Sequence, residues 1–221
     1  MRLLNDIFGY AWRGSGKFVL ATCVVLSVVA DLAGFAPGVG IVAWLLLSGY
    51  FSAVYFQLIQ SSATGGKEAP EFPDTSNLFE DLIWPMIQIL VVALVSFIPY
   101  SGYLAWVDEE NRNPGIAYGL LAFGILYFPM AMLAVVVLGR TSGLSPHIVL
   151  PAIFRAGWLY WLGILLLALL YLGGSLVEDL LKGQWIIGSL VMSAVGAYTL
   201  MTNARILGVV YRKRQEELGW L

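Results

Sequence analysis

Four ionisable side chains lie in or beside the most apolar parts of this chain, where an ionisable residue usually has a functional role. Asp31 is the only acid well inside an apolar segment long enough to cross a membrane. It could face a cavity or a partner, but it lies within a turn of the segment's end, where we expect water to solvate it. Arg205 ends the last apolar segment. We expect its side chain to extend to the membrane interface, although pairing with Glu80 or Asp81 would lock the C-terminal tail to a central loop.

These residues are not accompanied by a catalytic or metal-binding constellation. The chain has one cysteine, Cys23, and one histidine, His147, which is too few for a zinc-type cluster. It has no paired carboxylates, nucleophile elbow or phosphate-binding loop. An intramembrane enzyme acting on lipid would need acids, histidine or serine clustered at one depth, which the apolar segments do not offer. We therefore expect no catalytic residue, cofactor or metal, and predict that the protein is not an enzyme.

The composition is that of a membrane protein. Of 221 residues, 59% are hydrophobic and 12% are charged, whereas a soluble domain has about 45–50% apolar and about 25% charged residues. The lipid bilayer is therefore the first expected partner. The net charge of −2 indicates that nucleic acid is not a partner, because proteins that bind nucleic acids neutralise phosphates with clustered positive charge.

Apolar segments of about 20 residues predict six transmembrane helices. Short amphipathic segments at residues 1–13, 78–83 and 146–156 predict helices that lie in the membrane interface. Pro129 falls near the middle of the fourth predicted span and should bend it. The sequence thus predicts an all-α integral membrane protein with a single transmembrane domain over residues 1–221. The predicted spans cover approximately residues 18–35, 40–60, 82–106, 115–138, 157–177 and 185–204.

Six spans place both termini on the same side of the membrane. That side would hold all of the twelve basic residues except Arg112 and Lys182. Lysine and arginine concentrate in the cytoplasmic loops of membrane proteins, so this asymmetry predicts that both termini are cytoplasmic. An odd number of spans would spoil the pattern, which supports the count of six.

Three units of similar length can be drawn along the chain, at residues 1–66, 67–143 and 144–221. Each unit has a phenylalanine and then a tryptophan in the run that leads into its first span, and a glycine in its second span. Fixed periods indicate internal repeats, here three helical hairpins around a pseudo-threefold axis. The alternative stays open, because interfacial segments accumulate aromatic residues in any case. The positions concerned are Phe8, Trp12, Phe79, Trp84, Phe154 and Trp158, with Gly49, Gly124 and Gly196.

Several short motifs carry a resemblance to a known family. They are Gly49-Tyr50, Gly65, Pro70-Glu71-Phe72-Pro73-Asp74, Leu78-Phe79-Glu80-Asp81, Phe128-Pro129, Leu144-Ser145-Pro146 and an ending from Arg205-Ile206-Leu207-Gly208 to Leu218-Gly219-Trp220. With these motifs the chain resembles the prokaryotic multi-span membrane proteins grouped as domain of unknown function 4013. That family tends to have tryptophan where Phe72 stands. The resemblance implies the same architecture in a prokaryotic cytoplasmic (inner) membrane, and the family has no settled activity to carry over.

Two functions fit these features. Because no catalytic constellation occurs, while basic loops and a basic tail are predicted on the cytoplasmic side, we expect a non-enzymatic scaffold, regulator or subunit that partners another membrane or cytoplasmic protein. The alternative is a channel or transporter, which could assemble as a homo-oligomer. Pro129, the glycine-rich spans and the repeat favour it. Against it, the spans carry few of the ionisable groups that many transporters hold at mid-depth.

Overall fold

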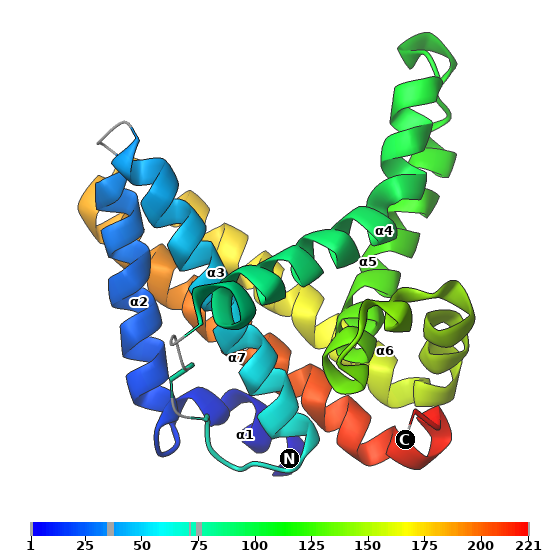
Figure 1. The fold of residues 1–221 in the computed structure, drawn as a ribbon. Helices are drawn as coiled ribbons and strands as arrows, with labels where there is room; N and C mark the ends of the chain where they lie inside the picture. The colour runs from blue at the N-terminus through cyan, green and yellow to red at the C-terminus, as the bar shows by residue number, and fades with distance from the viewer. Residues whose placement is uncertain (1, 35–37, 71, 74–76, 221) are drawn as a thin grey trace.

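The computed structural model describes residues 2–34, 38–70, 72–73 and 77–220, and every regular element in them is helical (Figure 1). The motif residues Glu71 and Asp74 lie outside the described residues. The elements in chain order are α1 (Arg2–Phe8), η1 (Tyr10–Trp12), α2 (Gly16–Ala33), α3 (Val39–Ala63), η2 (Phe79–Ile83), α4 (Trp84–Trp106), η3 (Glu109–Asn111), α5 (Pro114–Leu138), η4 (Thr141–Leu144), α6 (Pro146–Leu180) and α7 (Trp185–Leu218).

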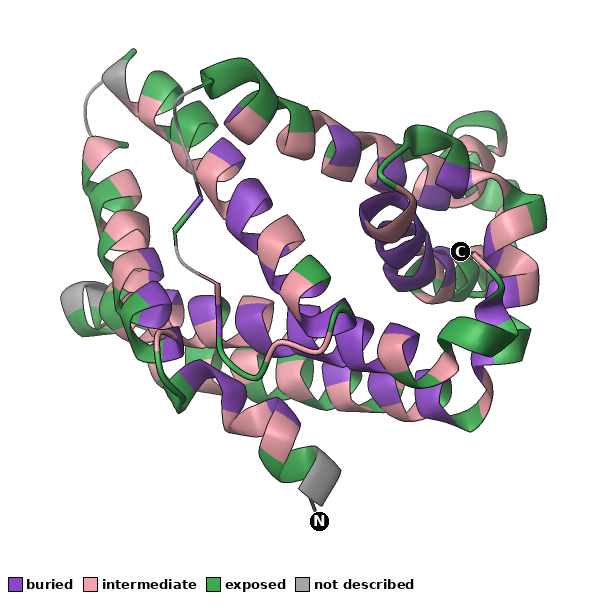
Figure 2. Cartoon of the chain, turned by 60° about the horizontal axis from the view of Figure 1, so that its bottom comes forward, coloured by how far each residue is buried: buried purple, intermediate pink, exposed green. Residues whose placement is uncertain are grey.

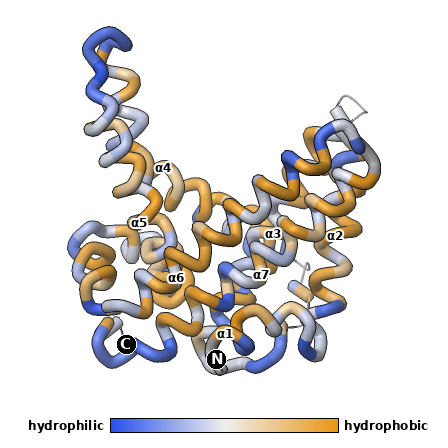
Figure 3. The backbone as a smooth tube through the Cα atoms, turned by 180° about the vertical axis from the view of Figure 1, so that it is seen from behind, coloured by the Kyte–Doolittle hydropathy of each residue, from blue (hydrophilic) through white to orange (hydrophobic). Residues whose placement is uncertain are grey.

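Six of the described helices are long and apolar enough to cross a membrane: α2, α3, η2 joined to α4, α5, α6 and α7. The shortest has 18 residues, or about 27 Å at 1.5 Å per residue, close to the ~30 Å of a bilayer core. Hydrophobic residues dominate along these helices, and hydrophilic residues gather at the tip of α4 and α5 and near the ends of the chain (Figure 3). The predicted all-helical class and the six apolar helices are confirmed.

Large apolar side chains cover the outward faces of these helices. Phe18, Trp44, Leu94 and Leu176 are each between 62% and 65% exposed. The buried residues gather where the helices meet (Figure 2). Soluble monomers rarely expose wide apolar patches, so this distribution suits a molecule whose outer faces contact lipid.

Helix α6 consists of two helical segments that meet at Gly157. Its φ of 60° and ψ of −150° lie outside the helical region, in a conformation that glycine adopts without the Cβ penalty. The prediction of a helix at 146–156 followed by a separate span from 157 is confirmed. At the N-terminus the predicted helix at 1–13 is interrupted, because α1 ends at Phe8 and the 3-10 turn η1 follows Gly9.

Three of the described long helices contain a proline inside them: α4, α5 and, at Pro151, α6. Pro99 lies in α4, and the ribbon of α4 changes direction along its length (Figure 1). Pro129 lies buried inside α5, which remains helical on both sides of it. The predicted bend at Pro129 stays a prediction.

Helix α7 is the central helix of the body. It contacts α1, α2, α3, α5 and α6. Its C-terminal end lies on the same side of the molecule as α1, which we call the terminal side, while η3 lies at the far tip of α4 and α5 (Figure 1). This position lets one residue of α7 contact segments from both the start and the middle of the chain.

Candidate functional site

Arg205, near the terminal end of α7, is buried with its charge. Its side chain is 1% exposed, and its Nη2 donates to Oδ2 of Asp6 at 2.9 Å. Its Nη1 donates to the carbonyl oxygen of Gly66 at 2.5 Å and to Oγ of Ser62 at 3.4 Å. A buried guanidinium requires compensation of this kind, because the loss of water around an ion is costly.

The position of Arg205 corrects both sequence expectations. The side chain does not extend to an exposed interface, and its acidic partner is neither Glu80 nor Asp81. The physical reason is that α7 is surrounded by other elements, so the guanidinium enters the junction of α1, α3 and the loop after α3. A link between α7 and the central loop, which the alternative implied, does exist, but the carbonyl of Gly66 makes it.

Asp6 lies among three arginines. Besides Arg205, the Nη1 of Arg13 lies 3.0 Å from its Oδ1, and the Nη2 of Arg212 lies 4.0 Å from its Oδ2. We call these four residues the Asp6–arginine cluster. Sequence reasoning missed Asp6, because an acid in a short amphipathic helix resembles an ordinary surface residue. The signal that could have found it is Arg205 itself, since an arginine followed by Ile206 and Leu207 needs an acid from elsewhere.

Tyr10 extends this cluster to the loop after α3. The guanidinium carbon of Arg205 lies 4.6 Å from the centre of the Tyr10 ring, within the range of a cation–π contact. The Tyr10 hydroxyl donates to the carbonyl of Glu68 at 3.3 Å, and Oγ of Ser15 donates to the carbonyl of Ala69. Burial raises the pKa of the Tyr10 phenol, so it stays protonated and remains a donor. Side chains from other elements thus hold the loop Gly65–Ala69 through its backbone carbonyl groups.

Two buried polar atoms beside the cluster have no hydrogen-bond partner within the part of the chain that the structure describes. They are Nε of Arg205 and Oγ1 of Thr202. Buried polar groups in folded proteins are almost always hydrogen-bonded. The buried guanidinium of Arg205 is therefore only partly hydrogen-bonded. Its ion pair with Asp6 is correspondingly more important for compensating its charge.

The other residues singled out in the sequence lie apart from this cluster. Asp31 is exposed, as expected for a solvated acid, and accepts a hydrogen bond from Ser189 at 2.5 Å, which joins α2 to α7. Glu80 is exposed, and Oδ2 of Asp81 accepts from the backbone N–H of Asn77 at 2.9 Å. Pro129 lies in the buried part of α5. The structure does not bring these four residues together.

A pocket of about 620 Å³, open on one side and here called the central cavity, lies between α3, α4, α5, α6 and α7. Its polar lining residues include Ser52 and Tyr55 of α3 and Asn203 of α7, and the Tyr55 hydroxyl donates to Oδ1 of Asn203 at 3.0 Å. Glu178, close to the end of α6 away from the termini, also lines it. Asp31 does not line this cavity.

A second cavity, of about 480 Å³, is lined by residues nearer the terminal ends of α3, α5 and α7, among them Gln57, Gln60 and Tyr211. On α5 and α7 the residues between the two cavities are buried, Met132 and Leu207 among them. On α3 the second cavity begins at Gln57, only two residues after Tyr55 of the first. The two cavities are therefore separated by buried residues of α5 and α7.

The chain matches no protein-family model, and it matches none of the curated proteins or solved structures with which it was compared. The class that the fold defines is a helical protein with six helices able to cross a membrane. The resemblance to the prokaryotic multi-span family stays a prediction.

Proposed function

We propose that this chain is a non-enzymatic multi-pass protein of the prokaryotic cytoplasmic membrane, with both termini in the cytoplasm, that acts as a scaffold, regulator or subunit of a membrane assembly. The six apolar helices support the membrane location. The near-exclusive placement of basic residues on the terminal side supports the orientation. The terminal side is then the cytoplasmic face and the surface on which a partner binds.

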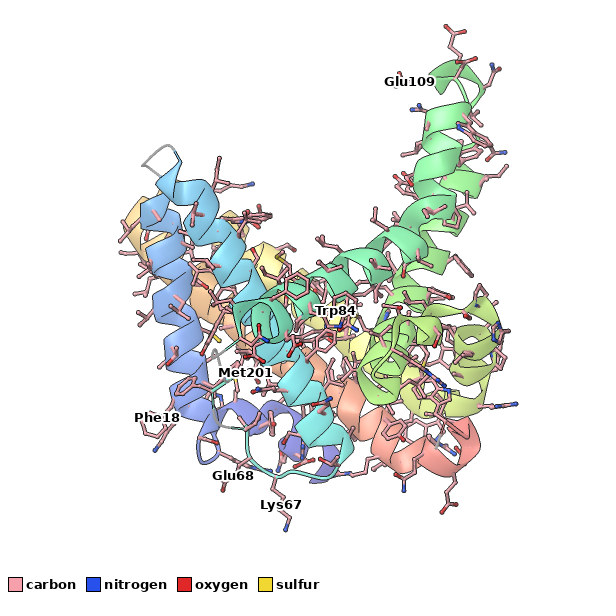
Figure 4. The ribbon with its side chains drawn as sticks, in the orientation of Figure 1. Phe18, Lys67, Glu68, Trp84, Glu109 and Met201 are labelled. Atoms are coloured by element: carbon pink, nitrogen blue, oxygen red, sulfur yellow. The ribbon has the colours of Figure 1, made fainter. Side chains whose placement is uncertain are left out.

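The Asp6–arginine cluster is the observation that carries this proposal. It joins α1, the loop Gly65–Ala69 and α7, which are far apart in the sequence. Buried ion pairs seldom add net stability, and their best-attested use is to fix one arrangement among alternatives. A fixed loop presents its exposed side chains at defined positions. Lys67 points away from the body on this face, and Glu68 beside it is exposed (Figure 4).

A photo-crosslinking amino acid at Lys67 tests the docking surface in the native membrane. We expect a discrete cross-linked product with a partner protein, because the side chain at this position extends from the fixed loop. The readout is a shifted band on a denaturing gel, identified by mass spectrometry.

The matched control is the same amino acid at Glu110, which is exposed at the opposite tip of the molecule in η3. It should not capture that partner. The absence of any product at Lys67, or the same product from both positions, would contradict the docking proposal.

We also propose the arrangement of three hairpins about a pseudo-threefold axis. The helix contacts follow a cyclic order that supports it. The first helix of each unit packs against the second helix of the preceding unit: α2 against α7, α4 against α3, and α6 against α5. The short elements that precede the first helix of each unit follow the same order: α1 and η1 contact α7, η2 contacts α3, and η4 contacts α5.

A transporter or channel is the second candidate, and the two cavities favour it. Both are lined by α3, α5 and α7, the second nearer the terminal side, and a buried layer of α5 and α7 residues around Met132 lies between them. In this candidate the layer is a closed gate. An impermeant thiol reagent that reached both Thr199→Cys and Gln60→Cys from one side of the membrane would establish a path. Reaction of each from its own side only would leave the two cavities as separate sites.

A further inference from the structure

We propose that the central cavity binds an uncharged, membrane-soluble small molecule whose aromatic or quinonoid ring carries a carbonyl oxygen. This inference is independent of the docking surface on the terminal side. It rests on the size of the cavity, on the rings that line it, and on the amide of Asn203.

The size and lining of the cavity suit a small cyclic ligand. Its volume of about 620 Å³ lies within the roughly 300–1,000 Å³ of small-molecule sites, which are mostly apolar with a few placed polar groups. Four aromatic residues line it from three helices: Phe51 and Tyr55 of α3, Phe128 of α5 and Tyr171 of α6. Aromatic pairs in offset or edge-to-face arrangements gain stability beyond the apolar area that they bury.

Asn203 determines which polar group the ligand presents. Its Oδ1 already accepts the hydroxyl of Tyr55 at 3.0 Å, and its amide group carries two N–H donors that can bind a ligand. An N–H group needs an acceptor, and a carbonyl oxygen on a ring supplies one. Thr199 and Ser52 also line the cavity and add hydroxyl groups on the same two helices.

The charge of the lining indicates an uncharged ligand. Of the described residues that line the cavity, only Glu178 is charged, and it is exposed near the end of α6. An ion bound deeper, between Tyr55 and Asn203, would be left without an opposite charge, and burying an unpaired ion is strongly unfavourable. A neutral ring with a polar edge avoids this cost.

Duroquinone and hexamethylbenzene form a matched pair of probes, because both are flat rings of similar outline. Hexamethylbenzene has a methyl-bearing ring carbon in place of each of the two carbonyl groups of duroquinone. Titration calorimetry with the protein in nanodiscs, with empty nanodiscs as the baseline for lipid partitioning, measures binding of each. We expect duroquinone to bind about tenfold more tightly than hexamethylbenzene, the effect of roughly one well-formed hydrogen bond.

Variants then locate the site. Asn203→Leu keeps the branching of the side chain, removes its amide, and should weaken duroquinone binding about tenfold more than hexamethylbenzene binding. A Cβ at Gly196, which lines the cavity, meets no atom within 4 Å, so Gly196→Leu should fill the space and abolish binding of both probes. Gly102→Leu in α4 is the control, since Gly102 is equally unobstructed and does not line the cavity.

Three outcomes would overturn the proposal. Equal binding of the two probes would remove the role of the carbonyl. Full duroquinone binding in Gly196→Leu would place the site elsewhere. A co-purifying phospholipid that duroquinone fails to displace, detected by native mass spectrometry, would identify the occupant as an acyl chain. The comparison of the two probes uses the unmodified protein, so it does not depend on the folding of any variant.

Discussion

Replacing Asp6 with leucine is expected to lower the free energy of unfolding by about 3–5 kcal/mol, the cost of leaving a buried charge without its partner. Arg205 is 1% exposed and pairs with Asp6 at 2.9 Å, and its Nε already lacks a hydrogen-bond partner among the described residues. Equilibrium unfolding in mixed micelles, titrated with sodium dodecyl sulfate, measures the change.

A matched control and a rescue make this prediction specific. Asp179 pairs with Lys182 at 2.7 Å, but both side chains are more than 60% exposed, so Asp179→Asn should cost less than about 1 kcal/mol. Combining Asp6→Leu with Arg205→Met should recover most of the lost stability, because an apolar pair replaces a buried ion pair at little cost. An Asp6→Leu variant as stable as Asp179→Asn would contradict this account of the cluster.

Gly208→Ala is expected to destabilise the protein by about 1–3 kcal/mol, the usual cost of forcing extra atoms into a packed interface. A Cβ at this position would lie 2.2 Å from Cβ of Ser62 and 2.8 Å from the backbone nitrogen of Ala63. Helices α3 and α7 would have to move apart, and the bonds from Arg205 to Ser62 and Gly66 span the same interface. The same unfolding titration measures the effect.

Gly196→Ala, in the same helix α7, is the control. The added Cβ meets no atom within 4 Å, and alanine has a helix propensity up to about 1 kcal/mol more favourable than glycine. It should leave stability unchanged or raise it. Equal losses of stability in Gly208→Ala and Gly196→Ala would mean that the close approach of α3 and α7 does not determine the cost of adding a Cβ at Gly208.

Local patterns in the sequence were sufficient to predict the helices. Hydropathy over about 20 residues predicted the six apolar helices, and the structure contains them. The helix at 146–156 was separable from the next span because its composition differs, and Gly157 permits the break between them. These features depend on neighbouring residues alone, so a single sequence contains the information.

The candidate site could not be predicted in the same way, because its contacts join distant residues. Asp6 and Arg205 are 199 positions apart, and Tyr55 and Asn203 are 148 apart. Apolar periodicity indicates which segments are helices but not which helices are neighbours. Arg205 could be recognised as a charge in need of compensation, yet the sequence suggested Glu80 or Asp81 as its partner, because the position of α1 against α7 cannot be read from local patterns.

The measurement that tests the central claim most directly is the labelling of single cysteines in intact and lysed cells. Serine in place of Cys23, the only native cysteine, provides the background. A membrane-impermeant maleimide should label Glu109→Cys, at the far tip of α4 and α5, in intact cells with a permeable outer layer. It should label Lys67→Cys, on the opposite face (Figure 4), only after lysis. The reverse pattern, or labelling of both positions in intact cells, would contradict a six-span protein whose terminal side, with the Asp6–arginine cluster, faces the cytoplasm.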